Sequence, residues 1–166
     1  TYSFEDVRQG GFVYVDKTAI LKRLADGSIG KQFFIARPRR FGKSLAVSTL
    51  QCLFEGRRDL FQGLSIEPLW DWSRKWPVLR LDLGSVQPDR AEDLEGLFTN
   101  ILADEAKRNG VALRRGESAP ITFTNLINDL ADQAPDGQMV LLVDEYDKPL
   151  LKRLNTPDVI PFRNAL

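Results

Sequence analysis

Apolar residues recur along the chain in a spacing that is typical of amphipathic helices. Between residues 89 and 109 they lie three and four positions apart, and residue 110 is glycine, so this segment is predicted as a helix. The same spacing predicts a helix from about Lys43 to near Gly56, and a shorter one around residues 123–130. A further helix is predicted after Asp16, which would cap it, with Gly27 at its end.

Three other segments are apolar without polar alternation, which is typical of buried strands. They are residues 31–36 (KQFFIA), 76–84 (WPVLRLDLG) and 138–149 (QMVLLVDEYDKP), and a short extended piece is expected at 13–15. Strands of this kind, separated by amphipathic helices, indicate a parallel sheet covered by helices on both faces. The predicted fold class is therefore α/β.

Composition narrows the chemistry that such a domain can perform. The 166 residues are enough for one ordinary domain with a core, and 23 basic residues balance 23 acidic ones, so any basic site must be local. The absence of histidine and the presence of one cysteine exclude Ser-His and Cys-His catalysis and thiolate metal clusters. Carboxylates, lysine, arginine and hydroxyls remain, an inventory that suits magnesium with phosphates.

The same features bear on where the protein works. A single cysteine suits a reducing compartment, and no run approaches the about 18 apolar residues of a membrane span. We therefore expect a cytoplasmic protein with no membrane association.

The stretch ARPRRFGKSL, residues 36–45, reads like the second half of a phosphate-binding loop. Gly42 would let the main chain approach phosphates, Lys43 would reach the β and γ oxygens, and the Ser44 hydroxyl would coordinate magnesium. Arg37 stands where the usual pattern has its first glycine, and Pro38 removes one N–H. Taken alone, GKS is equally compatible with a helix start that carries solvated charges.

A second motif about a hundred residues later supports the phosphate-loop interpretation. The apolar run MVLLVDEY ends in Asp144 and Glu145, and strand-end carboxylates of a parallel sheet face the crevice where ligands bind. Asp144 would hold magnesium and Glu145 would polarise the attacking water. The alternative is a strand that runs into a polar turn, with Asp147 capping a helix at Pro149; Asp147 and Lys148 are interpreted in this structural way.

Four segments together resemble the AAA-ATPase-like family: YVDKT (14–18), ARPRRFGKSL (36–45), PVLRLDL (77–83) and LLVDEYDKPL (142–151). The resemblance implies a P-loop NTPase, a three-layer α/β/α sandwich with a mostly parallel sheet, that binds and hydrolyses ATP with Mg²⁺. The chain would be the N-terminal part of one such domain, incomplete at its C-terminus, with an extension over 1–30 and a core over 31–166. The implied nucleotide-binding residues are Arg40, Phe41, Gly42, Lys43, Ser44 and Leu45, the metal ligands Ser44 and Asp144, and the catalytic residue Glu145.

The resemblance also bears on partners and rival functions. In the family this domain often precedes a nuclease-like domain of the PD-(D/E)XK type, so such a domain is expected in the full-length protein. A homo-oligomer is compatible with the sequence, and DNA is a candidate partner that the neutral charge of this chain does not support. A nucleotide-gated interaction module without turnover and a P-loop kinase of a small acceptor remain alternatives.

Several other residues are interpreted more conservatively. Arg37, Arg39 and Arg40 fit a phosphate, subunit or nucleic-acid contact as well as a solvated loop. Asp82 is either near the site or a turn residue. The remaining features are predicted to be structural, although the resemblance places the first pair near the nucleotide: Asp16 and Lys17 at a helix start, the three tryptophans Trp70, Trp72 and Trp76 in packing, and Cys52 in the core.

Overall fold

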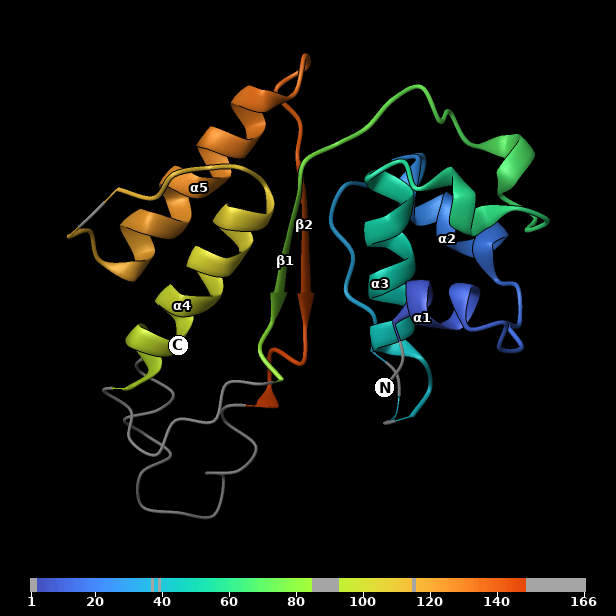
Figure 1. Cartoon of the computed structure of the whole chain (residues 1–166), viewed down its shortest axis with the longest axis horizontal. Coiled ribbons are helices and arrows are strands. Elements are labelled where there is room, and N and C mark those ends of the chain that lie inside the picture. Colours follow the sequence, from blue (N-terminus) through green and yellow to red (C-terminus); the bar gives the residue numbers. More distant parts are fainter. Residues whose placement is uncertain (1–2, 37, 39, 85–92, 115, 149–166) are drawn as a thin grey trace. The chain divides into compact units, whose positions relative to one another are not determined.

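The computed structural model describes residues 3–36, 38, 40–84, 93–114 and 116–148. The chain divides into two compact units, Thr1–Trp76 and Pro77–Leu166, and each is described by itself (Figure 1). Helices α1 to α3 belong to the first unit, whereas helices α4 and α5 and both strands belong to the second. None of the helices in the described ranges is long and apolar enough to cross a membrane.

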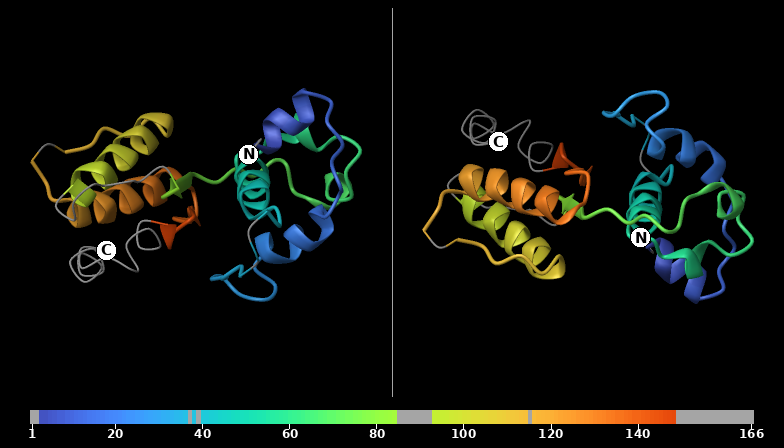
Figure 2. Two further views of the ribbon diagram at one scale, coloured as in Figure 1. Left: turned by 90° about the horizontal axis from the view of Figure 1, so that it is seen from below. Right: turned by 90° about the horizontal axis from the view of Figure 1, so that it is seen from above.

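The first unit is helical and is built around α3 (Lys43–Phe54). Two further helices, α1 (Phe4–Gln9) and α2 (Thr18–Ala25), pack against α3, as Figures 1 and 2 show. Two short 3-10 helices, η1 (Arg58–Phe61) and η2 (Glu67–Leu69), follow α3. The structure thus confirms the predicted helices at α2 and α3.

Helix α1 was not predicted, although its N-terminus carries a recognisable signal. The Ser3 hydroxyl accepts a hydrogen bond from Asp6 N–H (3.1 Å), and the Asp6 carboxylate accepts one from Ser3 N–H (2.9 Å). This reciprocal capping box satisfies two backbone donors at the start of a helix. A helix of six residues is too short to show a clear apolar period, so only the cap identifies it.

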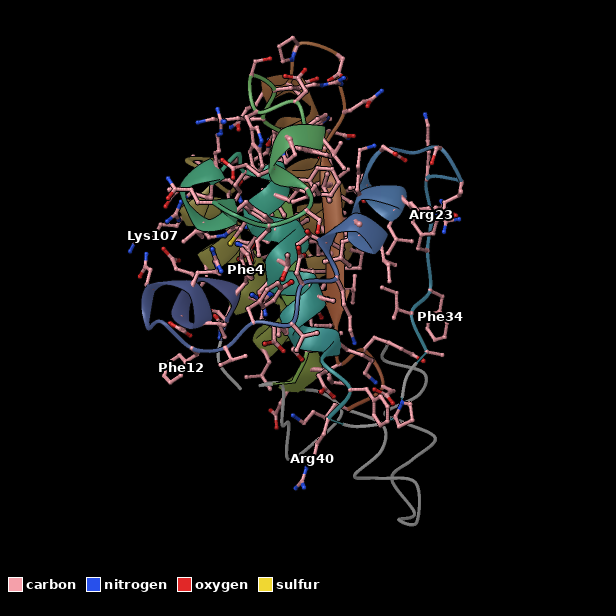
Figure 3. The ribbon with its side chains drawn as sticks, turned by 90° about the vertical axis from the view of Figure 1, so that its right-hand side faces the viewer. Phe4, Phe12, Arg23, Phe34, Arg40 and Lys107 are labelled. Carbon is pink, nitrogen blue, oxygen red and sulfur yellow. The ribbon has the colours of Figure 1, made fainter. Side chains whose placement is uncertain are left out.

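Phe4 ties α1 to the centre of the first unit. Its ring is fully buried and lies 4.8 Å from the ring of Phe61 and 5.2 Å from that of Tyr14, measured between centroids. Figure 3 shows Phe4 turned inward among the helices. Its N–H donates to Ser48 Oγ on α3 (2.9 Å), and Ser48 in turn donates to the Leu45 carbonyl (2.9 Å). The N-terminal segment is therefore anchored directly on the helix that begins with Lys43.

The tryptophans pack as expected. Trp70 and Trp76 lie 5.7 Å and 5.5 Å from the Phe54 ring, and Trp72 lies 5.1 Å from Phe61. Such aromatic pairs contribute packing energy beyond their buried area. This cluster closes the C-terminal end of α3, which confirms its interpretation as core packing.

The predicted strand over residues 31–36 is wrong. These residues have irregular backbone in the structure, and Phe33, Phe34 and Ile35 are 41%, 73% and 40% exposed. The described sheet has two strands, and this segment belongs to neither. A run of strand-forming residues becomes a strand only when another strand satisfies its backbone groups. The short extended piece expected at 13–15 belongs to neither strand of the described sheet, and Val13 and Val15 are exposed.

The second unit contains a small parallel sheet and two helices. Strand β1 (Val78–Asp82) pairs with β2 (Val140–Asp144) in a register that places Asp82 opposite Asp144. Helices α4 (Asp93–Arg108) and α5 (Ala119–Gln133) connect the strands and lie side by side in Figures 1 and 2. All four elements were predicted, and the α/β class with a parallel sheet is confirmed.

Both helices of this unit pack on the face of the sheet that carries Leu79 and Leu81. Leu102, Ala106, Leu126 and Leu130 complete a buried cluster with these two leucines. The sequence predicted helices on both faces, whereas the described part of this unit shows one helical layer. On the helical face, Leu141 and Val143 of β2 lie beside Leu79 and Leu81 in the parallel register but remain 41% and 43% exposed.

The outer edge of β1 is closed by polar side chains of α4 and the residue that follows it. Arg80 N–H donates to Glu105 Oε2 (2.8 Å), and the Val78 carbonyl accepts from Arg108 Nη2 (2.6 Å) and Asn109 Nδ2 (3.1 Å). Covering an edge in this way prevents another strand from pairing there. Among the described residues, the opposite edge of the sheet, along β2, pairs with no other strand.

Candidate functional site

The loop before α3 gives the helix a sharp, uncovered start. Arg40 and Gly42 both have left-handed backbone, with φ of 67° and 76°. Gly42 is the N-cap of α3, and its carbonyl accepts the first helical hydrogen bond, from Ala46 N–H (2.9 Å). A Cβ on Gly42 would meet no atom within 4 Å, so glycine is favoured here by its φ and not by lack of space.

The predicted nucleotide-binding residues are brought together at this helix start. Lys43, Ser44 and Leu45 form the first turn and are half-buried, whereas Phe41 is 68% exposed. The first N–H groups of a helix have no partner within it, and the helix dipole adds partial positive charge, so the position favours an anion. Figure 3 shows Arg40 projecting away from the ribbon beyond this end of α3. Arg37 and Arg39 lie outside the described residues.

The helix behind this loop is held firmly at its second turn. Ser48 and Thr49 are 3% and 1% exposed, and both hydroxyls donate to the Leu45 carbonyl, at 2.9 Å and 2.8 Å. Ser48 also accepts from Phe4 N–H, as described above. These contacts fix the direction in which the first turn of α3 points.

In the second unit, Asp144 and Glu145 form a tight turn at the end of β2. Asp144 is 5% exposed, and its Oδ1 accepts from Glu145 N–H (3.0 Å). Its carbonyl accepts from Leu83 N–H (3.1 Å), the last bond of the ladder with β1. A buried carboxylate is costly unless it has partners, which makes this position a candidate for binding a cation.

Glu145 has left-handed backbone, with φ of 53°. This conformation costs a residue with a Cβ about 1–2 kcal/mol, so the surrounding turn must enforce it. The Glu145 carbonyl accepts from Lys148 N–H (3.0 Å), which closes that turn. Strained residues of this kind cluster at functional sites, and the Glu145 side chain is half-buried.

Asp82 lies at the same end of the sheet as Asp144, opposite it in the parallel register. Its side chain is 53% exposed, and its Oδ1 accepts from Gly84 N–H (2.9 Å). Asp82 therefore forms a turn at the strand end and also places a carboxylate beside the Asp144–Glu145 turn. Both interpretations that the sequence left open describe part of its geometry.

The predicted metal ligands, Ser44 and Asp144, stay a prediction. Within the described ranges, no group of three or more acidic or cysteine side chains is arranged to hold a metal ion. The predicted ligands are one hydroxyl (Ser44) and one carboxylate (Asp144), which form no such group, because Mg²⁺ in phosphate sites takes its other ligands from phosphates and water. Ser44 belongs to the first unit and Asp144 to the second, and whether they share an ion stays a prediction.

A comparison of the sequence with known protein families now identifies the chain. Residues 1–163 match the family described as "Predicted AAA-ATPase". The chain belongs to this predicted AAA-ATPase family. The match covers both units, so the phosphate-loop half and the Asp-Glu half of the candidate site lie within one family segment.

One curated protein matches this member of the predicted AAA-ATPase family. It is an "Uncharacterized protein in vnfD 5'region" from Azotobacter chroococcum mcd 1, 41% identical over 158 residues. The match takes in 95% of the present chain but 30% of the relative, so the chain spans less than a third of that protein's length. No solved structure matches the chain.

Two residues beside the site were not predicted to take part in it. Gly84 and Lys148 approach each other at the carboxyl end of the sheet, next to Asp82 and Glu145. The signal for Gly84 is its place two residues after the end of β1, where a glycine allows close approach. Lys148 was interpreted as a turn residue because it belongs to the polar segment DEYDKP that follows the apolar strand.

The hydrogen bonds of the Asp16 carboxylate give this residue a structural role. Its two carboxylate oxygens accept four hydrogen bonds: from Thr18 N (2.9 Å) and Oγ1 (2.6 Å), and from Ser65 N (2.7 Å) and Oγ (2.6 Å). Asp16 is exposed, and the slight desolvation that it does have raises its pKa, but these bonds from Ser65 and Thr18 outweigh that effect and hold the pKa of Asp16 well below its usual value. The carboxylate starts α2 and joins it to the segment before η2, although Lys17, not Asp16, is the N-cap residue.

Proposed function

We propose that this chain is the ATP-binding part of a Mg²⁺-dependent ATPase. The observation that carries the proposal is the start of α3, where a left-handed Gly42 leads into a first turn that contains Lys43 and Ser44. Membership of the predicted AAA-ATPase family supports it independently. In this proposal the helix N–H groups and the Lys43 ammonium bind the phosphates.

The residues fit a magnesium ion in the way that phosphate-binding enzymes hold one. The Ser44 hydroxyl and the buried Asp144 carboxylate are hard oxygen donors, and they leave the remaining positions for phosphate oxygens and water. When bound, Mg²⁺ would neutralise phosphate charge. Glu145 would accept a proton from the attacking water, and its left-handed backbone would direct the carboxylate toward that water.

We also propose that the complete domain is a three-layer α/β/α sandwich. The outer edge of β1 is closed. In β2, alternate residues bond to β1, so the backbone groups of Leu141 and Val143 point to the other edge, with which no described strand pairs. We infer that the full sheet grows from β2.

The test of this proposal is nucleotide binding by the full-length protein. ATP is titrated with Mg²⁺ into the wild type and into Lys43→Ala, with Lys31→Ala as the matched control because Lys31 is an exposed lysine of the same unit. The account expects tight binding by the wild type and by Lys31→Ala, and its loss in a folded Lys43→Ala variant. Equal ATP affinity in all three proteins would reject the phosphate-loop assignment.

A further inference from the structure

The ammonium group of Lys148 lies at the carboxyl end of the sheet, directly over Gly84. A methyl group placed on Gly84 would lie 3.3 Å from Lys148 Nζ, 2.8 Å from Asp82 Oδ1 and 3.4 Å from Glu145 Cβ. Three side chains from two strand ends therefore converge on the one residue that has no side chain. Any larger residue at position 84 would displace the ammonium or the Asp82 carboxylate.

The charged groups around Lys148 are mostly acidic. Its ammonium and the Asp82 carboxylate lie within about 6 Å of each other, a range over which opposite charges attract appreciably. Asp144, Glu145 and Asp147 belong to the same strand end and turn, so acidic groups predominate there. An anionic phosphate would be repelled by these carboxylates, and a half-buried cation among them offsets that repulsion.

Lys148 and Glu145 are also joined by a backbone hydrogen bond. The Lys148 N–H donates to the Glu145 carbonyl (3.0 Å) and so belongs to the turn that holds Glu145 at φ 53°. The Lys148 ammonium and the Glu145 carboxylate thus belong to residues of the same turn. A ligand that contacts Glu145 would therefore lie near Lys148.

We propose that Lys148 donates a hydrogen bond to the terminal phosphate of the bound nucleotide, with Asp82 and the missing side chain at Gly84 keeping its ammonium in place. The inference rests on the proposed function, because it takes the nucleotide to lie against Asp144 and Glu145. A lysine ammonium carries three donors and suits a phosphate oxygen as a point charge. Its contact is with the γ-phosphate, so it distinguishes ATP from ADP.

The experiment compares ATP and ADP affinities of the full-length protein with those of three variants. Lys148→Met keeps the aliphatic stem and removes the charge, and Gly84→Ala keeps the charges but displaces them. Lys107→Met is the matched control, because Lys107 is an exposed lysine on α4 of the same unit (Figure 3). A thermal melt of each protein verifies folding.

We expect Lys148→Met to weaken ATP binding roughly tenfold or more while ADP binding changes by less than about twofold. Gly84→Ala should shift the ratio of the two affinities in the same direction, and Lys107→Met should leave it unchanged. If Lys148→Met fails to fold, the comparison of Gly84→Ala with Lys148→Arg takes its place. Arginine keeps the charge, so Lys148→Arg should preserve the preference for ATP over ADP better than Gly84→Ala, in which the lysine is displaced.

The outcomes separate this inference from the proposed function. A wild-type ratio of ATP to ADP affinity in folded Lys148→Met and Gly84→Ala overturns the role of Lys148 but leaves ATP binding intact. Equal losses of ATP and ADP affinity also overturn it, because they indicate a general structural effect. A wild-type protein that binds neither nucleotide overturns the proposed function itself, and the inference with it.

Discussion

Replacing Asp16 by asparagine tests whether one carboxylate holds the start of α2 against the segment before η2. Asparagine keeps the size of the side chain but offers one carbonyl oxygen in place of two carboxylate oxygens. The Ser65 and Thr18 backbone N–H groups both donate to Asp16, and one of them would then face an amide NH₂. Thr18 is fully buried, so a Thr18 N–H that loses its acceptor on residue 16 cannot bond to water instead.

The structure gives the size of the effect. Hydrogen bonds to a charged group are worth about 1.5–3 kcal/mol each, but Asp16 itself is exposed and water competes for it, so we expect Asp16→Asn to lower the free energy of unfolding by about 1–2 kcal/mol in total. Asp59→Asn is the control in the same unit. Asp59 pairs with Arg57 at 3.4 Å with 61% of its side chain exposed, and should cost less than about 1 kcal/mol.

The pH dependence gives a second, independent measure. The pKa of Asp16 in the folded protein is depressed, so its contribution is present above the unfolded pKa of about 3.9 and is lost as pH falls below that value. Urea unfolding should show a constant difference between wild type and Asp16→Asn from pH 5 to 7. That difference should shrink at pH 3. A difference that is the same at pH 3 and pH 7 would refute the reasoning.

Three further predictions concern stability and reactivity. Phe61→Ala removes a fully buried ring that contacts Phe4 and Trp72, and should cost about 3–5 kcal/mol in urea unfolding; a loss below 1 kcal/mol would contradict the described core. Burial raises the pKa of the Cys52 thiol to about 12, so iodoacetamide at pH 8 should label it only after unfolding, and rapid native labelling would be evidence against its burial. Glu145→Gly relieves the left-handed backbone and should leave the free energy of unfolding unchanged or raise it by up to about 1 kcal/mol, whereas a clear destabilisation would show that the turn is not strained.

The sequence predicts well those elements whose signal is local. Helices α3, α4 and α5 show an apolar period over 12 to 16 residues, and both strands of the sheet are short apolar runs bounded by turns. The segment 31–36 has the same composition as a strand but lacks a pairing partner among the described residues. Strand formation depends on a neighbour that the sequence of one segment does not contain.

The residues of the candidate site also differ in how well the sequence predicts them. Gly42, Lys43 and Ser44 are consecutive, so their convergence at one helix start follows from the chain itself. The approach of Lys148 to Gly84 depends instead on the parallel register of β1 and β2, which joins residues 64 positions apart in the sequence. Asp16 was predicted to start a helix, which is local, but its bonds to Ser65 join residues 49 positions apart and could not be predicted from the motif.

The most direct test of the central claim is ATP turnover by the full-length Glu145→Gln protein, measured as phosphate release alongside ATP affinity. Glutamine keeps the size of the side chain and its capacity for hydrogen bonds but cannot accept the proton of the attacking water. The account predicts ATP affinity close to that of the wild type and a hydrolysis rate lower by about 10²–10⁴-fold. Hydrolysis at the wild-type rate by a folded Glu145→Gln protein would contradict it.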